Sequence, residues 1–244
     1  MTPEALGEVA KQFPEVTATA AVIAGIICMT KTDDKSIADA TNWLELSWAT
    51  GREPASEVHA RPYVNYENQF MVRVAEGVNV AAMADRRGIA LMLAELYQAQ
   101  GDIEKAIDIV DDEQVDSVLA VSLAELLILK ERFDEVIAMT DGIKNEDDAT
   151  ALLCVFRGVA MREKGMYLAA REGFKEALRI RSRDTEIRNR AWIERAACYL
   201  AEGKRGMARN DIERIMAIDS SYPGLKEALA NLDGEKPEET PETD

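Results

Sequence analysis

Residues 150–180 carry the pattern that decides the fold: TALLCVFRGVAMREKGMYLAAREGFKEALRI. Apolar residues recur at helical spacing on both sides of Gly165, which predicts two amphipathic helices joined by a short turn. Glycine is favoured just after the end of a helix, because it adopts left-handed backbone angles without steric cost. We therefore predict a helical hairpin whose first helix is closed by Gly165.

Three further stretches share this design, at residues 89–109, 122–137 and 191–218. Gly101 and Gly203 occupy the turn position of the first and last stretch, and Glu131 occupies it in the second. The steps between the four turn positions are 30, 34 and 38 residues, with a mean of 34. Two helices of one hairpin can bury only one face against each other, so each hairpin needs a neighbour. The sequence therefore predicts stacked hairpins.

This pattern resembles the tetratricopeptide repeat (TPR), whose period is also 34 residues. The resemblance covers residues 87–222, and the segment 169–230 also resembles uncharacterised TPR proteins of actinobacteria. The positions expected to pack the repeats together are Ala94, Tyr97, Gly101, Ala106, Ala124, Phe133, Gly158, Gly165, Ala170, Phe174, Ala177, Trp192, Ala196, Tyr199, Gly203 and Ala208. The chain departs from the family in its uneven repeat lengths and in lacking a proline at the end of the second helix in the first three repeats.

The predicted fold class is all-α, a TPR-like superhelix of helical hairpins with a small β-hairpin inserted near residues 69–82. Residues 1–60 are predicted to form three helices that either cap the array or add a helical pair. Residues 61–86 are predicted to form a loop and β-hairpin connector, because prolines and asparagines precede an alternating stretch with Gly77 in its turn. Residues 87–232 are predicted to form the repeat array, and residues 233–244 are expected to be a disordered acidic tail.

The net charge of the chain is −16, which argues against general binding to nucleic acids or anionic membranes. Residues 157–214 nevertheless contain 15 Lys or Arg against 9 Asp or Glu, a local charge of +6. Cys28, Cys154 and Cys198 each lie among apolar neighbours, so we expect buried, reduced thiols and a cytoplasmic protein.

A search for catalytic or ligand-binding motifs finds none. The one histidine, His59, has no Cys or Ser partner at a known motif spacing, and the chain has no P-loop, GxGxxG, GxSxG, HExxH or CxxC motif. The carboxylate clusters at residues 111–113 and 146–148 lack the spacing of a calcium loop, and the second fits a helix cap before residues 149–155. We therefore expect no catalytic residue, cofactor or metal site.

A stripe of arginines is the strongest candidate for a partner-binding surface. It can be a solvated helical face whose acidic neighbours supply ion pairs, or it can recognise an acidic segment of a partner or of the chain's own tail. An apolar groove on the first helices, near Arg162 and Arg190, would accompany it. The residues assigned to partner binding are Phe156, Val159, Arg162, Arg179, Arg183, Arg190 and Arg195.

The function expected from these features is that of a non-enzymatic scaffold or adaptor that binds a protein or peptide on its concave surface. An alternative is a regulatory protein that senses a peptide or metabolite, which would require a closed pocket lined by polar side chains. A third is an enzyme whose carboxylates converge near His59 or the hairpin. The sequence leaves open the identity of the partner and the oligomeric state.

Overall fold

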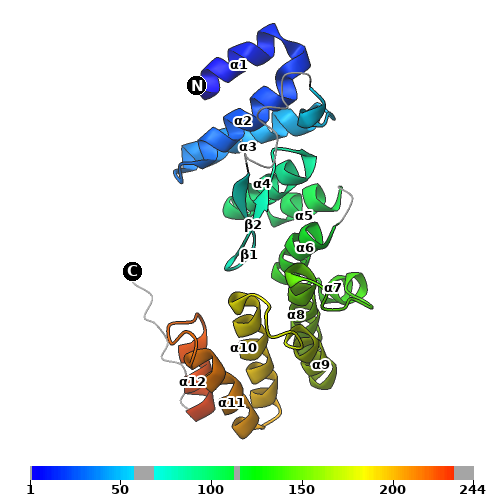
Figure 1. Cartoon of the computed structure of the whole chain (residues 1–244), viewed down its shortest axis with the longest axis vertical. Coiled ribbons are helices and arrows are strands. Elements are labelled where there is room, and N and C mark those ends of the chain that lie inside the picture. Colours follow the sequence, from blue (N-terminus) through cyan, green and yellow to red (C-terminus); the bar gives the residue numbers. More distant parts are fainter. Residues whose placement is uncertain (1, 58–68, 113–115, 234–244) are drawn as a thin grey trace. The chain divides into compact units, whose positions relative to one another are not determined.

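The computed structural model describes residues 2–57, 69–112 and 116–233, which are mainly helical (Figure 1). This part of the chain forms an all-α helical-repeat fold with one small antiparallel sheet, as predicted. The elements are α1 (Pro3–Gln12), η1 (Pro14–Val16), α2 (Thr17–Met29), α3 (Asp34–Ala49), η2 (Pro54–Ser56), β1 (Phe70–Ala75), β2 (Val78–Ala82), α4 (Arg86–Ala99), α5 (Ile103–Asp111), α6 (Ser117–Leu129), α7 (Phe133–Met139), α8 (Asp148–Glu163), α9 (Tyr167–Ala177), α10 (Thr185–Ala201), α11 (Arg205–Met216) and α12 (Leu225–Asp233).

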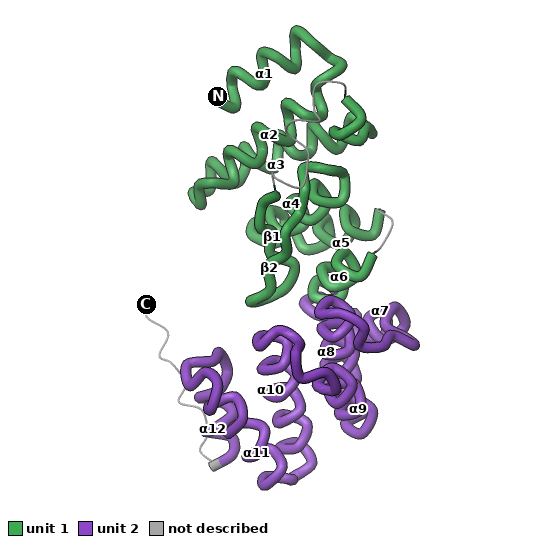
Figure 2. The backbone as a smooth tube through the Cα atoms, viewed as in Figure 1, with its two compact units in different colours: residues 1–126 green, residues 127–244 purple. Residues whose placement is uncertain are grey.

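The chain divides into two compact units, residues 1–126 and residues 127–244 (Figure 2). The division falls inside α6, so the predicted repeat array, residues 87–232, contributes to both units. The four predicted segments are defined by changes in residue composition along the chain. The two units are defined by which residues lie close together in space. The predicted segment boundaries therefore remain a prediction, and the predicted acidic tail lies almost wholly outside the described residues.

The first unit begins with three helices, α1 to α3, in the region predicted to be helical. Thr2 caps α1 by accepting a hydrogen bond from the backbone N–H of Ala5, with Pro3 in the first turn. Helix α2 is apolar around most of its circumference and packs against α3, with Gly25 of α2 facing Leu44 of α3. A Cβ atom on Gly25 would lie 2.7 Å from Leu44 Cγ, so glycine permits this close approach.

Among the described residues, no helix combines the length and apolar character that crossing a bilayer requires.

The predicted β-hairpin is present as β1 and β2, joined by a turn in which Gly77 has a φ of +73°. Its two central valines, Val72 and Val74, are buried, and β1 packs against α4. Side chains of the helices also form hydrogen bonds with the backbone of the β-hairpin. The Glu95 carboxylate accepts the N–H of Arg73, and the Glu125 carboxylate accepts the N–H of Glu76, both at 3.2 Å. A lone hairpin is marginally stable in water, and this one is stabilised by the helices beneath it.

Four helical hairpins share one turn geometry, at the four positions predicted from the sequence. Gly101, Gly165 and Gly203 have φ values of +80°, +73° and +72°, and Glu131 has a φ of +56°. In each turn the residue after this position donates its N–H to the carbonyl five residues earlier, as Arg132 does to Leu127 at 2.9 Å. This bond satisfies a carbonyl that the end of the helix would otherwise leave unpaired. Of the non-glycine residues in the described chain, Glu131 alone has a positive φ.

The second unit stacks consecutive hairpins, because α8 and α9 pair with each other and both contact α10. At the α8–α9 contact, a Cβ atom on Gly158 would lie 2.5 Å from the buried ring of Phe174, so the two helices approach closely. The next core joins α10 and α11 through Ala196, Ala208 and Ile212, and α12 extends it. Within this unit, each pair of helices covers the apolar face left by the pair before it, as the repeat pattern predicts.

Candidate functional site

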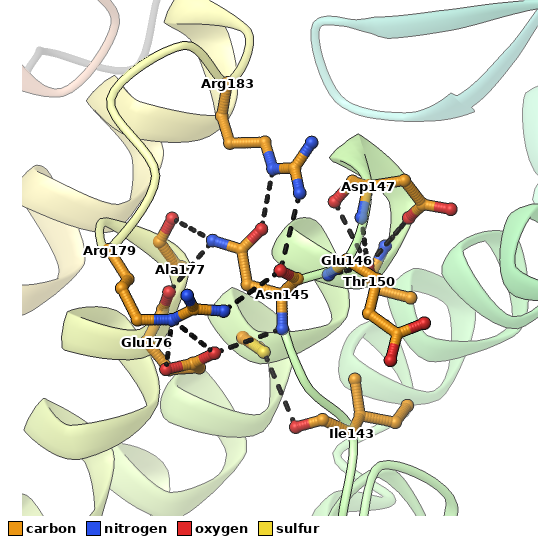
Figure 3. Close-up of polar contacts among 10 residues, drawn as sticks. Ile143, Asn145, Glu146, Asp147, Thr150, Glu176, Ala177, Arg179 and Arg183 are labelled. Atoms are coloured by element: carbon orange, nitrogen blue, oxygen red, sulfur yellow. Dashed lines mark hydrogen bonds and ion pairs between the residues drawn. The ribbon is translucent and has the colours of Figure 1, made fainter.

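The loop between α7 and α8 is held to the end of α9 by the buried side chain of Asn145 (Figure 3). Its Nδ2 group donates to the backbone carbonyls of Glu176 and Ala177, both at 2.9 Å. Its backbone N–H donates to the Glu176 carboxylate at 3.2 Å. The Ala177 carbonyl at the C-terminus of α9 receives its hydrogen bond from Asn145, whereas the Glu176 carbonyl also accepts the backbone N–H of Arg179 at 3.1 Å.

Two arginines of the predicted partner-binding set belong to this network. Arg183 donates from Nε to Asn145 Oδ1 at 2.6 Å, and its side chain is 14% exposed. Arg179 donates from Nε to the Glu176 carboxylate at 3.0 Å and from Nη2 to the Asn145 carbonyl at 3.2 Å. Both side chains therefore have partners inside the unit, and their assignment to an external partner remains a prediction.

The carboxylate cluster at residues 146–148 acts as a helix cap, as expected. Asp147 accepts a hydrogen bond from the backbone N–H of Thr150 at 2.7 Å, and the Thr150 hydroxyl oxygen accepts one from the backbone N–H of Asp147 at 2.9 Å. This reciprocal capping box lowers the pKa of Asp147, chiefly through the hydrogen bond from the Thr150 backbone. The other cluster lies at the end of α5, where Asp111 is the last helical residue, and Glu113 lies outside the described residues.

Arg195 is also engaged inside the second unit. Its guanidinium donates to both carboxylate oxygens of Asp211, at 2.8 Å and 2.7 Å, and the Asp211 side chain is 3% exposed. Arg214 donates to the same carboxylate at 3.2 Å. A bidentate pair of this kind fixes the orientation of both side chains. The pair joins α10 to α11 and leaves Arg195 little freedom to bind a partner.

The remaining predicted residues lie near one another on α8 and α10. Phe156 and Val159 are buried, and the guanidinium of Arg190 lies 4.8 Å from the centre of the Phe156 ring. Arg162 pairs with the Glu194 carboxylate at 2.9 Å. Burial raises the pKa of Glu194, while Arg162 and Arg190 act in the opposite direction. Phe156 and Val159 thus serve the core, whereas the Arg162–Glu194 pair lies partly exposed.

This ion pair borders a groove of about 310 Å³ that we call the first-helix groove. It lies between α8 and α10, which begin successive hairpins in this unit, and α12, the single helix that follows the last hairpin. The groove is lined by Arg162 of α8, by Ile193, Glu194, Ala197 and Leu200 of α10, and by Ala228 of α12. The sequence predicts an apolar groove on the first helices near Arg162, but it does not predict the wall supplied by α12.

The sequence of α12 contains a helical pattern of apolar residues that is not part of the repeat pattern. Leu225, Ala228 and Leu232 recur at helical spacing, and all three are buried in the core shared with α10 and α11. A single helix after the last hairpin covers the apolar face that no further repeat would bury. Its outer residues then become one side of the first-helix groove.

A second groove of about 830 Å³ opens on the opposite face of α10 and is called here the α9–α11 groove. It lies between the end of α9 and the end of α11. Its walls include Leu178, Arg181, Arg188, Trp192, Arg214 and Ile218. The groove combines six cationic side chains with the carboxylates of Glu172 and Glu176, an indole ring and several aliphatic side chains.

The described residues include no group of three or more His, Cys, Asp or Glu side chains placed to hold a metal ion. All three cysteines are free and buried, and burial raises the pKa of the Cys154 and Cys198 thiols to about 11. Such thiols are poor nucleophiles near neutral pH, because the reactive thiolate is scarce. His59 lies outside the described residues, so the enzyme alternative built on it is not tested by the structure.

Comparison with known proteins identifies a structural neighbour for this fold. No family model matches the chain, and no curated protein matches its sequence. The structure is similar to the N-terminal domain of the EccA1 ATPase from the ESX-1 secretion system of Mycobacterium tuberculosis, with a TM-score of 0.62 and 16% sequence identity. The match covers 94% of this chain and 81% of that chain. The chain therefore shares the helical-repeat fold of that domain.

Proposed function

We propose that this chain is a non-enzymatic adaptor that binds a segment of a partner protein in the first-helix groove. The observation that carries the proposal is the composition of that groove: Ile193, Ala197 and Leu200 form an apolar floor, and the Arg162–Glu194 pair lies at its border. Apolar surface supplies binding free energy, and charged groups at the border select the orientation of the bound segment.

The helical-repeat fold supports this proposal, because stacked hairpins present the surfaces of successive helices side by side. In the second unit, α8, α10 and α12 together form a groove whose lining comes from three separate elements. An amphipathic helix or an extended peptide can lay its apolar side chains into such a groove. The small size of the groove favours a weak, reversible interaction over a permanent complex.

A cytoplasmic location belongs to the same proposal. Three cysteines remain free and buried, and burial of a reduced thiol is typical of proteins in reducing compartments. An adaptor of this kind would meet its partners inside the cell.

To test the proposal, peptides that bind the full chain are selected from a random displayed library. The affinity of the selected peptides is then measured for the original chain and for its variants. Ala197→Trp should fill the groove and weaken the selected peptides by about tenfold or more, because the new indole occupies the volume that a ligand side chain needs. Ala138→Trp is the matched control, since Ala138 is exposed on α7 and lies outside both grooves. Equal affinity for the Ala197→Trp variant and the original chain would show that the first-helix groove is not the binding site.

A further inference from the structure

The α9–α11 groove holds a local excess of positive charge that internal ion pairs do not cancel. Four cations on its walls pair with carboxylates of the same unit: Lys175 with Glu172, Arg179 with Glu176, and both Arg195 and Arg214 with Asp211. Arg181 and Arg188 also line the groove, and neither forms an ion pair with any residue that the structure describes. These two guanidinium groups are therefore available to an anionic ligand.

The groove also offers apolar surface beside these cations. The guanidinium of Arg188 lies 4.9 Å from the centre of the Trp192 ring, a distance at which a cation is attracted to the face of an indole. Ile218 lies at the groove and is 47% exposed. Stacking holds the planar guanidinium in place while leaving its N–H groups free to donate, and a fixed guanidinium loses less entropy when it binds a carboxylate.

We propose that the α9–α11 groove binds an acidic segment of a partner polypeptide. Carboxylates of the segment pair with Arg181 and Arg188, and an apolar side chain of the segment packs against Trp192 and Ile218. Charge complementarity identifies the ligand class, because residues 157–214 carry a local +6 in a chain whose net charge is −16. A nucleic acid is disfavoured by that net charge, since the repulsion of a long polyanion extends beyond the groove.

This surface is separate from the first-helix groove. Successive residues of an α-helix are about 100° apart around its axis, which places residues 188, 192 and 195 on one face of α10 and residues 193, 197 and 200 on the opposite face. Each groove takes its lining from one of these faces. The two grooves therefore share no lining residue, and the proposal does not depend on the function assigned to the first-helix groove.

The test measures the fluorescence anisotropy of a labelled peptide of Glu and Asp residues with one central Phe, titrated with the full chain. We expect saturable binding that weakens as salt is added, because ion pairs on an exposed surface are screened. The same peptide with Gln and Asn in place of the acids should not bind. The variant Arg181→Glu/Arg188→Glu should lose about tenfold or more in affinity, because two attractive pairs become repulsive.

The matched control is Arg205→Glu/Lys226→Glu, which changes the net charge equally. Both residues are exposed and lie outside the α9–α11 groove, so this variant should bind the acidic peptide within about twofold of the original chain. Ala197→Trp should also leave this binding unchanged, which separates it from the proposed adaptor function. If far-UV circular dichroism shows that the Glu variant loses helix, Arg181→Gln/Arg188→Gln replaces it and should still weaken binding.

Several results would overturn the proposal. One is the absence of saturable binding by the original chain, and another is equal binding of the neutral peptide. An equal loss in both charge-changed variants would mean that net charge matters and the groove does not. Equal binding of a single-stranded oligonucleotide of the same charge would reject an acidic polypeptide as the ligand class. If the original chain does not bind and truncation after Asp233 creates binding, the groove is occupied by the chain's own C-terminal segment.

Discussion

Glu131 tests whether left-handed backbone angles at the hairpin turns limit the stability of this fold. It has a φ of +56° at a position that is glycine in the other three hairpins. Left-handed backbone angles cost about 1–2 kcal/mol for a residue with a Cβ atom. Glycine removes that cost, but it destabilises the folded state by about 0.5–1 kcal/mol because it increases the conformational entropy of the unfolded chain. Glu131 is exposed. We therefore expect Glu131→Gly to raise the free energy of unfolding by about 0.5–1 kcal/mol.

Urea unfolding followed by far-UV circular dichroism measures this change, with the denaturation midpoint compared at constant slope. Hydrogen exchange of peptides from α7 gives a local readout, because segments of one protein open with different free energies and α7 begins directly after this turn. Glu213→Gly is the matched control. Glu213 is exposed in the interior of α11, where glycine should lower the free energy of unfolding by about 1 kcal/mol.

Glu131→Ala separates backbone strain from the effect of the carboxylate. Alanine keeps the Cβ atom, so this variant should have nearly the stability of the original chain. The reasoning is refuted if Glu131→Gly is no more stable than the original while Glu213→Gly loses stability as expected. It is also refuted if Glu131→Ala gains as much as Glu131→Gly, since charge removal would then explain the gain.

Three further predictions concern the second unit and are measured by unfolding. Asn145→Ala should lower the free energy of unfolding by about 2–3 kcal/mol, because it removes two amide hydrogen bonds and leaves the Ala177 carbonyl unpaired, whereas wild-type stability would mean that water replaces the amide. Gly158→Ala should cost about 1–3 kcal/mol, because its Cβ atom would overlap the Phe174 ring, and a neutral effect would show that α8 and α9 separate easily. Burial and a hydrogen bond to Glu186 raise the pKa of Tyr222. Above about pH 10 the unfolded chain loses the phenol proton that the folded chain keeps, so the free energy of unfolding should fall as the pH rises. Tyr222→Phe should reduce that alkaline slope, and an unchanged slope would contradict the assignment.

The sequence by itself determined the helical hairpins, the positions of their turns and the β-hairpin. These features depend on short-range physics: helical spacing of apolar residues, alternation along a strand, and the left-handed residue that follows a helix. Even Glu131, which lacks the freedom of glycine, was located by register and has the expected left-handed geometry. The repeat pattern also predicts Gly158 as a packing position, and in the structure it is where α8 approaches the Phe174 ring of α9 closely.

Only the tertiary structure decided what the arginine stripe does. Arg183 bonds Asn145 across 38 positions of sequence, and Arg195 bonds Asp211 across 16. Spacing along one helix cannot reveal such pairs, because they depend on how the next helix or loop is placed. The same holds for the wall that α12 adds to the first-helix groove and for the exposed cations of the α9–α11 groove. Local pattern determines which faces of a helix are charged, whereas packing between hairpins determines which of those charges remain open to a partner.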